Sequence, residues 1–243
     1  MITRRTEIRD ERCNRLLAPL LTMVLTGLLA GLAEAADEPT VLITGSNRGI
    51  GLELARQYAE RGWNVIATAR KPDAAEALKA IQAKQSNLVI AQLDVTDHDR
   101  IDELAAEYQG KPIDILINNA GISGGHEKSK FGEMDLSVYP QVHAVNVVGP
   151  TKMAEAFIDS IRISDQKKII NITSGQGSIA RTWGCCSIYR SSKSALNMMM
   201  RNISIDLKKQ GITVGLISPG FVKTGFTPGL DLPMMRSEEH TSE

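Results

Sequence analysis

From Thr40 onward, short continuous apolar runs alternate with longer stretches in which apolar residues recur every three or four positions. The short runs, bounded by turn residues, predict strands buried on both faces, and the longer period predicts amphipathic helices. We expect strands at residues 41–43, 65–68, 88–93, 113–117, 168–172 and 213–217, with helices after 49–51 and over about 73–84, 100–108, 142–157 and 187–209. This alternation, with right-handed crossovers, predicts an α/β fold: a doubly wound parallel sheet in three αβα layers of the Rossmann type.

Length and composition fit one globular domain. The chain has 243 residues, and residues 40–235 contain no repeat or linker that would divide them. Its 28 Lys and Arg balance 28 Asp and Glu, so no basic surplus favours nucleic-acid binding. The three cysteines, Cys13, Cys185 and Cys186, have neither metal-ligand spacing nor a disulfide framework. We therefore expect no metal site, and we interpret the adjacent Cys185 and Cys186 as small apolar loop residues rather than a redox pair.

Residues 1–35 differ in composition from the rest. Arginines outnumber acidic residues before residue 16, residues 16–33 carry no charge, and Ala33 and Ala35 have the spacing of a cleavage site. This layout predicts a secretory signal and hence an exported, periplasmic protein. The apolar run is also close to the length of a membrane anchor. The remaining alternative is an extension from a wrongly chosen start codon, on a cytoplasmic protein.

The other end of the chain, residues 236–243, resembles the translation of a sequencing adapter, and we exclude it from the fold. The natural chain is then expected to continue beyond Met235. In that case the final strand of the sheet is missing from this sequence, and the folded domain covers residues 40–235.

The segment between the first predicted strand and helix, residues 44–51, is rich in glycine. Glycines let the backbone turn tightly and approach a pyrophosphate, whose charge is stabilised by amides at a helix N-terminus. About twenty residues further on, dinucleotide folds place the side chain that contacts the adenosine ribose. An NAD site would need Asp or Glu there, whereas this chain has Arg70, and Arg48 supplies a second cation. The two arginines predict NADP(H), whose 2′-phosphate is anionic.

Tyr189 and Lys193 lie four residues apart in a predicted helix, so their side chains share one face. A tyrosine hydroxyl has a pKa of about 10, and a neighbouring ammonium is expected to lower it toward neutrality. Taken alone, this pattern is also typical of a surface pair. The context favours a site, because polar residues and glycines follow the other predicted strands at the carboxyl edge of the sheet, where ligands bind.

Several motifs occur in the order that is typical of one family. They are the 44–51 turn, Asp94 with Val95, residues 118–121, Asn146, Ser174, Tyr189 with Lys193, and Pro219 with Gly220. On these motifs the chain resembles the short-chain dehydrogenase/reductase family, in its compact single-domain branch, over residues 40–235. Residues 174–179 and 189–197 further resemble carbonyl reductases of the sniffer and C-factor type.

The resemblance implies an oxidoreductase that transfers hydride between NADP(H) and a carbonyl or alcohol substrate. In such an enzyme Tyr189 would be the general acid or base, and Ser174 would donate to the substrate oxygen. Lys193 would lower the pKa of Tyr189 and bind the nicotinamide ribose. Asn146 would hold a water that relays protons to Lys193. A buried asparagine with a satisfied amide is the alternative for Asn146.

The resemblance also implies which residues contact the cofactor, NADP(H). They are Gly45, Ser46, Asn47, Arg48, Gly49, Ile50, Gly51, Arg70, Asp94, Val95, Asn118, Ala120, Gly121, Tyr189, Lys193, Pro219, Gly220 and Thr224. Gly225 departs from the acidic residue that is expected after Thr224, which affects the geometry expected of that loop.

For the substrate we expect a small aldehyde, ketone or quinone, bound near Trp183, Cys185, Cys186 and the segment 124–131. The alternative function is an NADP(H)-binding regulatory or interaction protein with little turnover, since fold does not fix function. As partners we expect a small molecule, no nucleic acid, and a membrane only through residues 1–35. We also expect a homo-oligomer in the full-length form.

Overall fold

The computed structural model describes residues 38–125, 131–182, 185–220, 222–223 and 235–236. Residues 1–35, predicted to be a signal or an anchor, lie outside these ranges, and so do residues 237–243 of the predicted adapter sequence. Both assignments therefore stay predictions. Within the described ranges, no helix is both long enough and apolar enough to cross a membrane.

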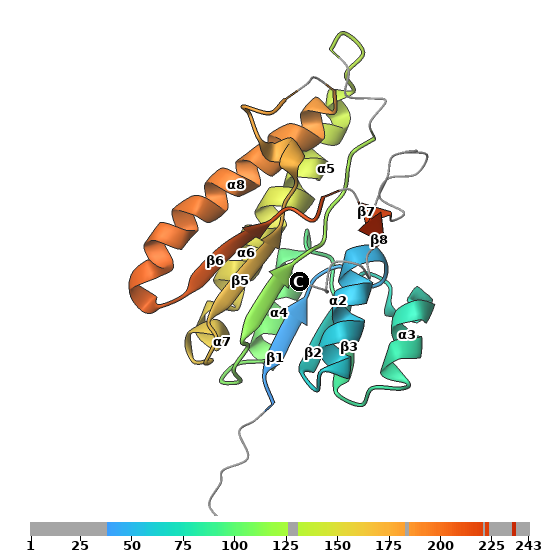
Figure 1. The fold of residues 1–243 in the computed structure, drawn as a ribbon, viewed down its shortest axis with the longest axis vertical. Helices are drawn as coiled ribbons and strands as arrows, with labels where there is room; N and C mark the ends of the chain where they lie inside the picture. Colours follow the sequence, from blue (N-terminus) through green and yellow to red (C-terminus); the bar gives the residue numbers. More distant parts are fainter. Residues whose placement is uncertain (1–37, 126–130, 183–184, 221, 224–234, 237–243) are drawn as a thin grey trace, which may run out of the picture. The chain divides into compact units, whose positions relative to one another are not determined.

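A six-stranded parallel sheet forms the middle layer, in the order β3-β2-β1-β4-β5-β6 (Figure 1). Its strands are β1 (Thr40–Ile43), β2 (Asn64–Ala69), β3 (Leu88–Gln92), β4 (Ile115–Asn118), β5 (Lys168–Ile172) and β6 (Thr213–Ile217). From β1 the chain adds β2 and β3 on one side, and then crosses over to add β4, β5 and β6 on the other. This order confirms the predicted doubly wound sheet. The order in which strands are added reverses between β1 and β4, and open α/β sheets bind their ligands at such a point.

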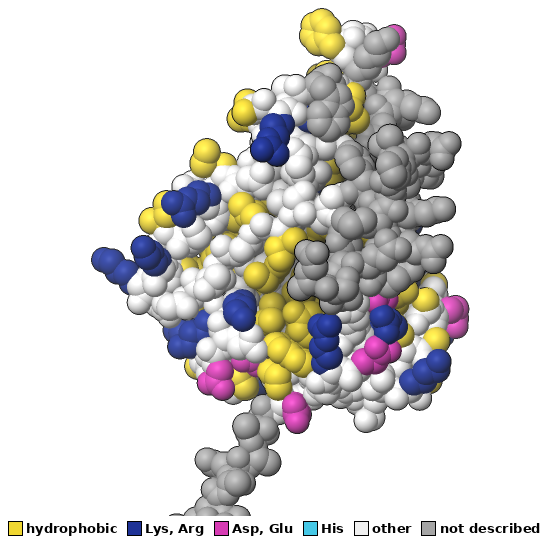
Figure 2. All heavy atoms as spheres, in the orientation of Figure 1, with side chains coloured by type: hydrophobic (Ala, Val, Ile, Leu, Met, Phe, Trp, Pro, Cys, Tyr) yellow, Lys and Arg dark blue, Asp and Glu magenta, His cyan; other side chains and the backbone are white. Residues whose placement is uncertain are grey.

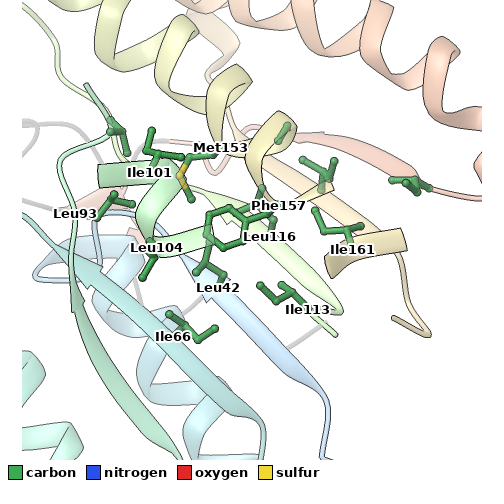
Figure 3. Packing of buried hydrophobic residues seen from close by; sticks show 14 residues of the cluster. Leu42, Ile66, Leu93, Ile101, Leu104, Ile113, Leu116, Met153, Phe157 and Ile161 are labelled. Carbon is green, nitrogen blue, oxygen red and sulfur yellow. The ribbon is translucent and has the colours of Figure 1, made fainter. Parts of the chain in front are cut away.

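Helices cover both faces of this sheet (Figure 1). They are α2 (Gly49–Glu60), α3 (Glu76–Gln82), α4 (His98–Glu107), α5 (Tyr139–His143), α6 (Gly149–Ala156), α7 (Ile158–Arg162) and α8 (Ser187–Leu207). One core joins α2 and α3 to the sheet, through side chains such as Ala55, Leu78 and Val65. The other core joins α4, α6 and α7 to the sheet, with Phe157 among its fully buried members (Figure 3). α8 lies beside α5 and β6.

The helix predicted over residues 142–157 contains a turn of a different type. The chain forms α5, then a π-helical segment at Ala144–Val148, then α6 and α7. Pro150 explains the wider turn, because proline has no N–H to donate to a carbonyl in the preceding turn. At Gly149 a Cβ would lie 2.9 Å from the carbonyl oxygen of Val95, so glycine lets the helix approach the β3–α4 connection closely. The prediction of a helix here is confirmed through Ala156, and the π-helical turn within it was not predicted.

The other predicted elements agree with the structure within a few residues. Strands β5 and β6 have the predicted bounds, whereas the helix predicted over 73–84 is a 3-10 turn at Pro72–Ala74 followed by the shorter α3. Val222–Lys223 (β7) and Met235–Arg236 (β8) form a separate two-stranded pair. Arg236, the first residue of the predicted adapter segment, therefore belongs to β8, and the predicted truncation stays a prediction.

The strands differ in how far they are covered. β1 is buried at three of its four positions, whereas Leu216 and Ile217 of β6 are 40% and 48% exposed. Figure 2 shows hydrophobic side chains gathered on the face that it presents. Contiguous apolar surface often marks the place where another segment or chain packs. The predicted homo-oligomer would make use of such a surface, and it stays a prediction.

Replacing Phe157 by alanine should lower the free energy of unfolding by about 3–5 kcal/mol, because the ring fills the core at the α6–α7 junction and its loss leaves a cavity. Urea unfolding measures this change. Phe131→Ala is the matched control, since that ring is 93% exposed, and we expect a change within about 0.5 kcal/mol. Equal losses in the two variants would contradict the placement of Phe157.

Candidate active site

The loop between β1 and α2 is held against the end of β4 by hydrogen bonds. The Asn119 side-chain amide donates to the carbonyl oxygens of Thr44 at 2.9 Å and Gly45 at 3.1 Å. The Thr44 hydroxyl accepts from the main-chain amides of Asn119 and Ala120, both at 3.0 Å. Gly45 has a φ of 70°, which favours glycine, and a Cβ at Gly51 would lie 2.5 Å from the Gly45 carbonyl oxygen. Gly45 is thus required by its backbone conformation, and Gly51 is required because no space is left for a side chain.

α2 begins without a side-chain cap. Its N-cap residue, Arg48, is extended and makes no capping hydrogen bond, and the first turn of the helix contains no acidic residue. N–H groups at a helix N-terminus carry a partial positive charge and need acceptors. The start of α2, beside the point where the strand order reverses, is therefore suited to an anion such as a pyrophosphate.

A cavity of about 740 Å³ extends from this loop to α8. Its volume is in the range of small-molecule and cofactor pockets. Most of the predicted site residues line it: Gly45, Asn47, Arg48, Gly49, Ile50, Arg70, Asp94, Val95, Ala120, Gly121, Ser174, Tyr189, Lys193, Pro219 and Gly220. The fold therefore brings residues from the ends of separate strands into one space, as the carboxyl-edge argument predicted.

Basic side chains lie at the end of the cavity beside β2. Arg48 and Arg70 are exposed, and among the described residues neither forms an ion pair. Lys71, the neighbour of Arg70, lines the same cavity. Guanidinium groups bind phosphate oxygens through paired, charge-assisted hydrogen bonds. This end of the cavity therefore fits a phosphate group better than a neutral hydroxyl.

Four predicted contacts are not placed at the cavity. Ser46 is fully buried, and its hydroxyl donates to a main-chain carbonyl oxygen at 2.9 Å. Asn118 is buried as well, and its amide donates to the Asn171 side chain at 2.9 Å. Gly51 is buried within the turn, and Thr224 lies outside the described residues. Hydrogen bonds turn the side chains of Ser46 and Asn118 into the protein, so a cofactor contact at either residue would have to come from the main chain, and both contacts stay predictions.

Ser174, Tyr189 and Lys193 meet at the α8 side of the cavity. The Ser174 hydroxyl hydrogen-bonds to the Tyr189 side chain and accepts from the main-chain N–H of Gln176 at 3.2 Å. Lys193 Nζ lies 5.8 Å from the Tyr189 ring centre and donates to the Ile172 carbonyl oxygen at 2.9 Å. Tyr189 is 7% exposed and Lys193 is 5% exposed. Helical spacing thus places the two side chains on one face, as predicted.

Burial sets the protonation of this pair. It raises the pKa of Tyr189 to about 12, while the hydrogen bond with Ser174 acts in the opposite direction. Burial also lowers the pKa of Lys193 to about 8. The expectation that Lys193 lowers the pKa of Tyr189 toward 7 is therefore wrong in this structure, because burial of the phenol raises this pKa and outweighs the hydrogen bond with Ser174. At pH 7 the phenol holds its proton and the lysine its charge.

Asn146 lies in the π-helical segment and is fully buried. Its amide donates to the Ile122 carbonyl oxygen at 2.9 Å and to the Ser192 hydroxyl at 3.0 Å, and its side-chain oxygen accepts from the Ile122 amide at 2.9 Å. The side chain thus ties the segment after β4 to α8. This matches the alternative of a buried, satisfied asparagine, and the role of Asn146 in holding a water stays a prediction.

Gln176 and Asn119 both line the cavity. They belong to the motifs at 174–179 and 118–121, but neither was predicted as a site residue. Gln176 lies two residues after Ser174, in a 3-10 turn at Gly175–Gly177. Asn119 anchors the glycine-rich loop, as described above. The signal that could have found them is position, because each follows the carboxyl end of a strand beside a residue that was predicted.

The sheet is doubly wound and carries a glycine-rich turn, cations follow β2, and a tyrosine and a lysine are buried at the carboxyl edge. This combination is typical of a dinucleotide-dependent oxidoreductase. The family model of the short chain dehydrogenases matches residues 39–232, and the chain belongs to this family. The resemblance found in the sequence is thereby confirmed.

Similar proteins cover most of the chain. The short-chain dehydrogenase anuI from Penicillium roqueforti is 35% identical over 212 residues, which are 80% of this chain and 83% of anuI. The NADPH-bound carbonyl reductase from chicken fatty liver is 32% identical, with a TM-score of 0.77 over 84% of this chain and 88% of its own. The carbonyl reductase Sniffer of D. melanogaster is 29% identical, with a TM-score of 0.74 and the same coverage.

The buried charge of Lys193 predicts a pH dependence of stability. Between its folded pKa of about 8 and its ordinary value of 10.5, the unfolded chain binds more protons than the folded one, so stability rises with pH. The free energy of unfolding, relative to Lys193→Met, should therefore increase from pH 7.5 to pH 10, by at most about 1.4 kcal/mol per pH unit. Urea unfolding at several pH values measures it.

The control for this experiment is Lys84→Met, because Lys84 is exposed. Its difference from the unchanged protein should stay constant over the same pH range. A Lys193→Met difference that is flat, or that falls with rising pH, would show that Lys193 is not buried as a cation.

Proposed function

We propose that this protein is an NADP(H)-dependent carbonyl reductase that acts on a small aldehyde, ketone or quinone. The proposal rests on one observation: the glycine-rich turn and the two arginines line the same cavity as Ser174, Tyr189 and Lys193. A proton donor thus lies in the same space as an anion-binding loop. The carbonyl reductases among the similar structures support this activity.

The residues around the cavity fit NADP(H). The turn at residues 45–51 leaves no room for a Cβ at Gly51, and the start of α2 presents amides to the pyrophosphate. Arg48 and Arg70 would bind the 2′-phosphate. Other contacts would come from residues along the cavity, which are Asp94, Val95, Ala120, Gly121, Pro219 and Gly220. When bound, the cofactor supplies the hydride for reduction.

Tyr189 would act as the general acid. Its Oη would give a proton to the substrate oxygen as that oxygen gains negative charge, and such catalysis contributes about 10²–10⁴ in rate. Ser174, hydrogen-bonded to Tyr189, would donate to the same oxygen and fix its position. The ammonium of Lys193 would stabilise the phenolate that remains after transfer.

The raised pKa of Tyr189 favours the reductive direction. Burial raises this pKa to about 12, so the phenol is protonated at neutral pH and is ready to act as an acid. Alcohol oxidation would require the phenolate as a base, a form that burial disfavours. We therefore propose that carbonyl reduction is the reaction this site performs most readily near pH 7.

Tyr189→Phe should lower kcat by about 10²–10⁴ and leave NADPH affinity unchanged, because it removes one proton donor and keeps the ring. Stopped-flow oxidation of NADPH with a panel of aldehydes, ketones and quinones measures the rate, and a fluorescence titration measures binding. Tyr108→Phe, at the end of α4, is the control and should retain full activity. If Tyr189→Phe kept the parent's rate, the mechanism would be wrong. Tight NADPH binding without turnover in the parent would favour the alternative of a regulatory protein.

Arg70→Ser should weaken NADPH binding about 10- to 100-fold and leave NADH binding unchanged, since hydrogen bonds between charged groups contribute about 1.5–3 kcal/mol. The same fluorescence titration, run with both cofactors, measures the ratio. Arg61→Ser is the control, because Arg61 caps the opposite end of α2. Equal loss for NADPH and NADH would mean that Arg70 does not bind the 2′-phosphate.

A further inference from the structure

Cys185 and Cys186 lie directly before α8, close to the site in sequence and in space. Their Sγ atoms are 2.7 Å apart, with Cys185 exposed and Cys186 buried. From the sequence alone, the two cysteines are interpreted as small apolar loop residues. The structure instead places two thiols within hydrogen-bond distance of each other, four and three residues before Tyr189.

The backbone at these cysteines adopts an unusual conformation. Cys185 has a φ of 79° and Cys186 a φ of 55°, and Lys167 is the one other non-glycine residue with positive φ in the described part of the chain. The left-handed conformation costs roughly 1–2 kcal/mol per residue that carries a side chain. Such conformations persist where the surroundings enforce them, and they concentrate at functional sites. Here the carbonyl oxygen of Cys186 accepts from the Arg190 amide at 2.9 Å in the first turn of α8.

We propose that Cys185 and Cys186 form a redox-active dithiol, which hydroperoxides oxidise to a disulfide between neighbouring residues, and that this disulfide switches off the adjacent site. The first half of the proposal concerns the cysteines alone. The second half rests on the proposed function, since it concerns the placement of Tyr189.

The chemistry proceeds in two balanced steps. The Cys185 thiol loses its proton, and its sulfur attacks one peroxide oxygen, which breaks the O–O bond and gives a sulfenic acid and one water. The Cys186 sulfur then attacks the Cys185 sulfur and displaces the hydroxyl as a second water. Two thiols are oxidised by two electrons, and one hydroperoxide is reduced to water, or to an alcohol and water.

The two thiols are suited to different steps. Cys185 is exposed and therefore meets the oxidant first. Cys186 is buried, and burial, with the neighbouring Cys185, raises the pKa of its thiol to about 11, while the charge of Arg190 acts in the opposite direction. A buried thiol of this kind reacts slowly with a dissolved oxidant. Its partner sulfur, however, is already 2.7 Å away, so the second step needs no encounter.

A disulfide between neighbours is easily reversed. The described peptide bonds are all trans, and consecutive Cα atoms across a trans peptide lie about 3.8 Å apart. Disulfides usually join Cα atoms about 4.4–6.8 Å apart, and departures from that range make the bond more reducible. Strained, exposed disulfides are of the regulatory rather than the structural type. Small thiols should therefore restore the dithiol.

Closing this ring would disturb the site through α8. Cys186 is the N-cap residue of α8, and its carbonyl oxygen forms the first hydrogen bond of the helix. Tyr189 lies within that first turn and depends on it for its position beside Ser174. The glycine-rich loop belongs instead to β1 and α2 and is anchored by Asn119. Oxidation is therefore expected to affect proton transfer more than cofactor binding.

The test treats the full-length protein with hydrogen peroxide, blocks remaining thiols with iodoacetamide, and analyses the peptide that contains both cysteines by mass spectrometry. The proposal requires loss of two hydrogens with no alkylation, reversed by dithiothreitol. Cys13→Ser should behave like the parent, and Cys185→Ser and Cys186→Ser should give no such peptide. Alkylation of both thiols after treatment, or a bond from either to Cys13, would overturn the proposal.

Steady-state kinetics of the same samples test the effect on Tyr189. Oxidation should lower kcat by about 10²-fold, as expected when a catalytic group is misplaced by an ångström, with NADPH affinity unchanged. The kcat of Cys186→Ser should not change on treatment with peroxide. If the disulfide forms and kcat stays constant, the switch is overturned. If the untreated protein shows no turnover, the proposed function fails, and the mass measurement still decides whether the dithiol is redox-active.

Discussion

The contact between the glycine-rich loop and the end of β4 is the constraint on which the rest of the site depends. Asn119 and Thr44 join the two segments by four hydrogen bonds, and Gly51 leaves the space that this approach requires. The contact lies where the strand order reverses, so it fixes the position of the α2 amides relative to every residue that follows β4. A side chain at Gly51 would separate the two halves of the sheet edge, and the cavity would lose its phosphate-binding end.

Burial of charge gives this site its chemical character. Tyr189 and Lys193 are both buried, and burial favours the neutral form of each side chain. It raises the pKa of the phenol and lowers the pKa of the ammonium. The proton therefore resides on the phenol, and Lys193, with a pKa of about 8, keeps its charge at pH 7. A site of this kind releases a proton when a substrate oxygen gains negative charge beside it, which is the requirement of carbonyl reduction.

The sequence predicted the element order, the sheet and most cavity residues, because buried strands and glycine-rich turns leave strong local patterns. Strands β5 and β6 even have the predicted bounds. The π-helical turn before α6 was missed because it depends on Pro150 together with the approach of Gly149 to Val95, a contact between distant segments. The inward direction of the Ser46 and Asn118 side chains was not predicted, because a motif match gives position along the chain and not the direction of a side chain. The pKa of Tyr189 was predicted with the wrong sign because burial cannot be read from spacing.

The cysteine pair and the predicted export signal constrain each other. Positive φ at Cys185 and Cys186 leaves no trace in composition or spacing, so the sequence alone favoured small apolar loop residues. If the two form a disulfide that displaces Tyr189, an active enzyme needs a compartment that keeps thiols reduced, as the cytosol does and an extracellular space does not. NADPH is also supplied in the cytoplasm. The proposed dithiol and the predicted secretory signal therefore require opposite redox conditions, and the localisation stays a prediction.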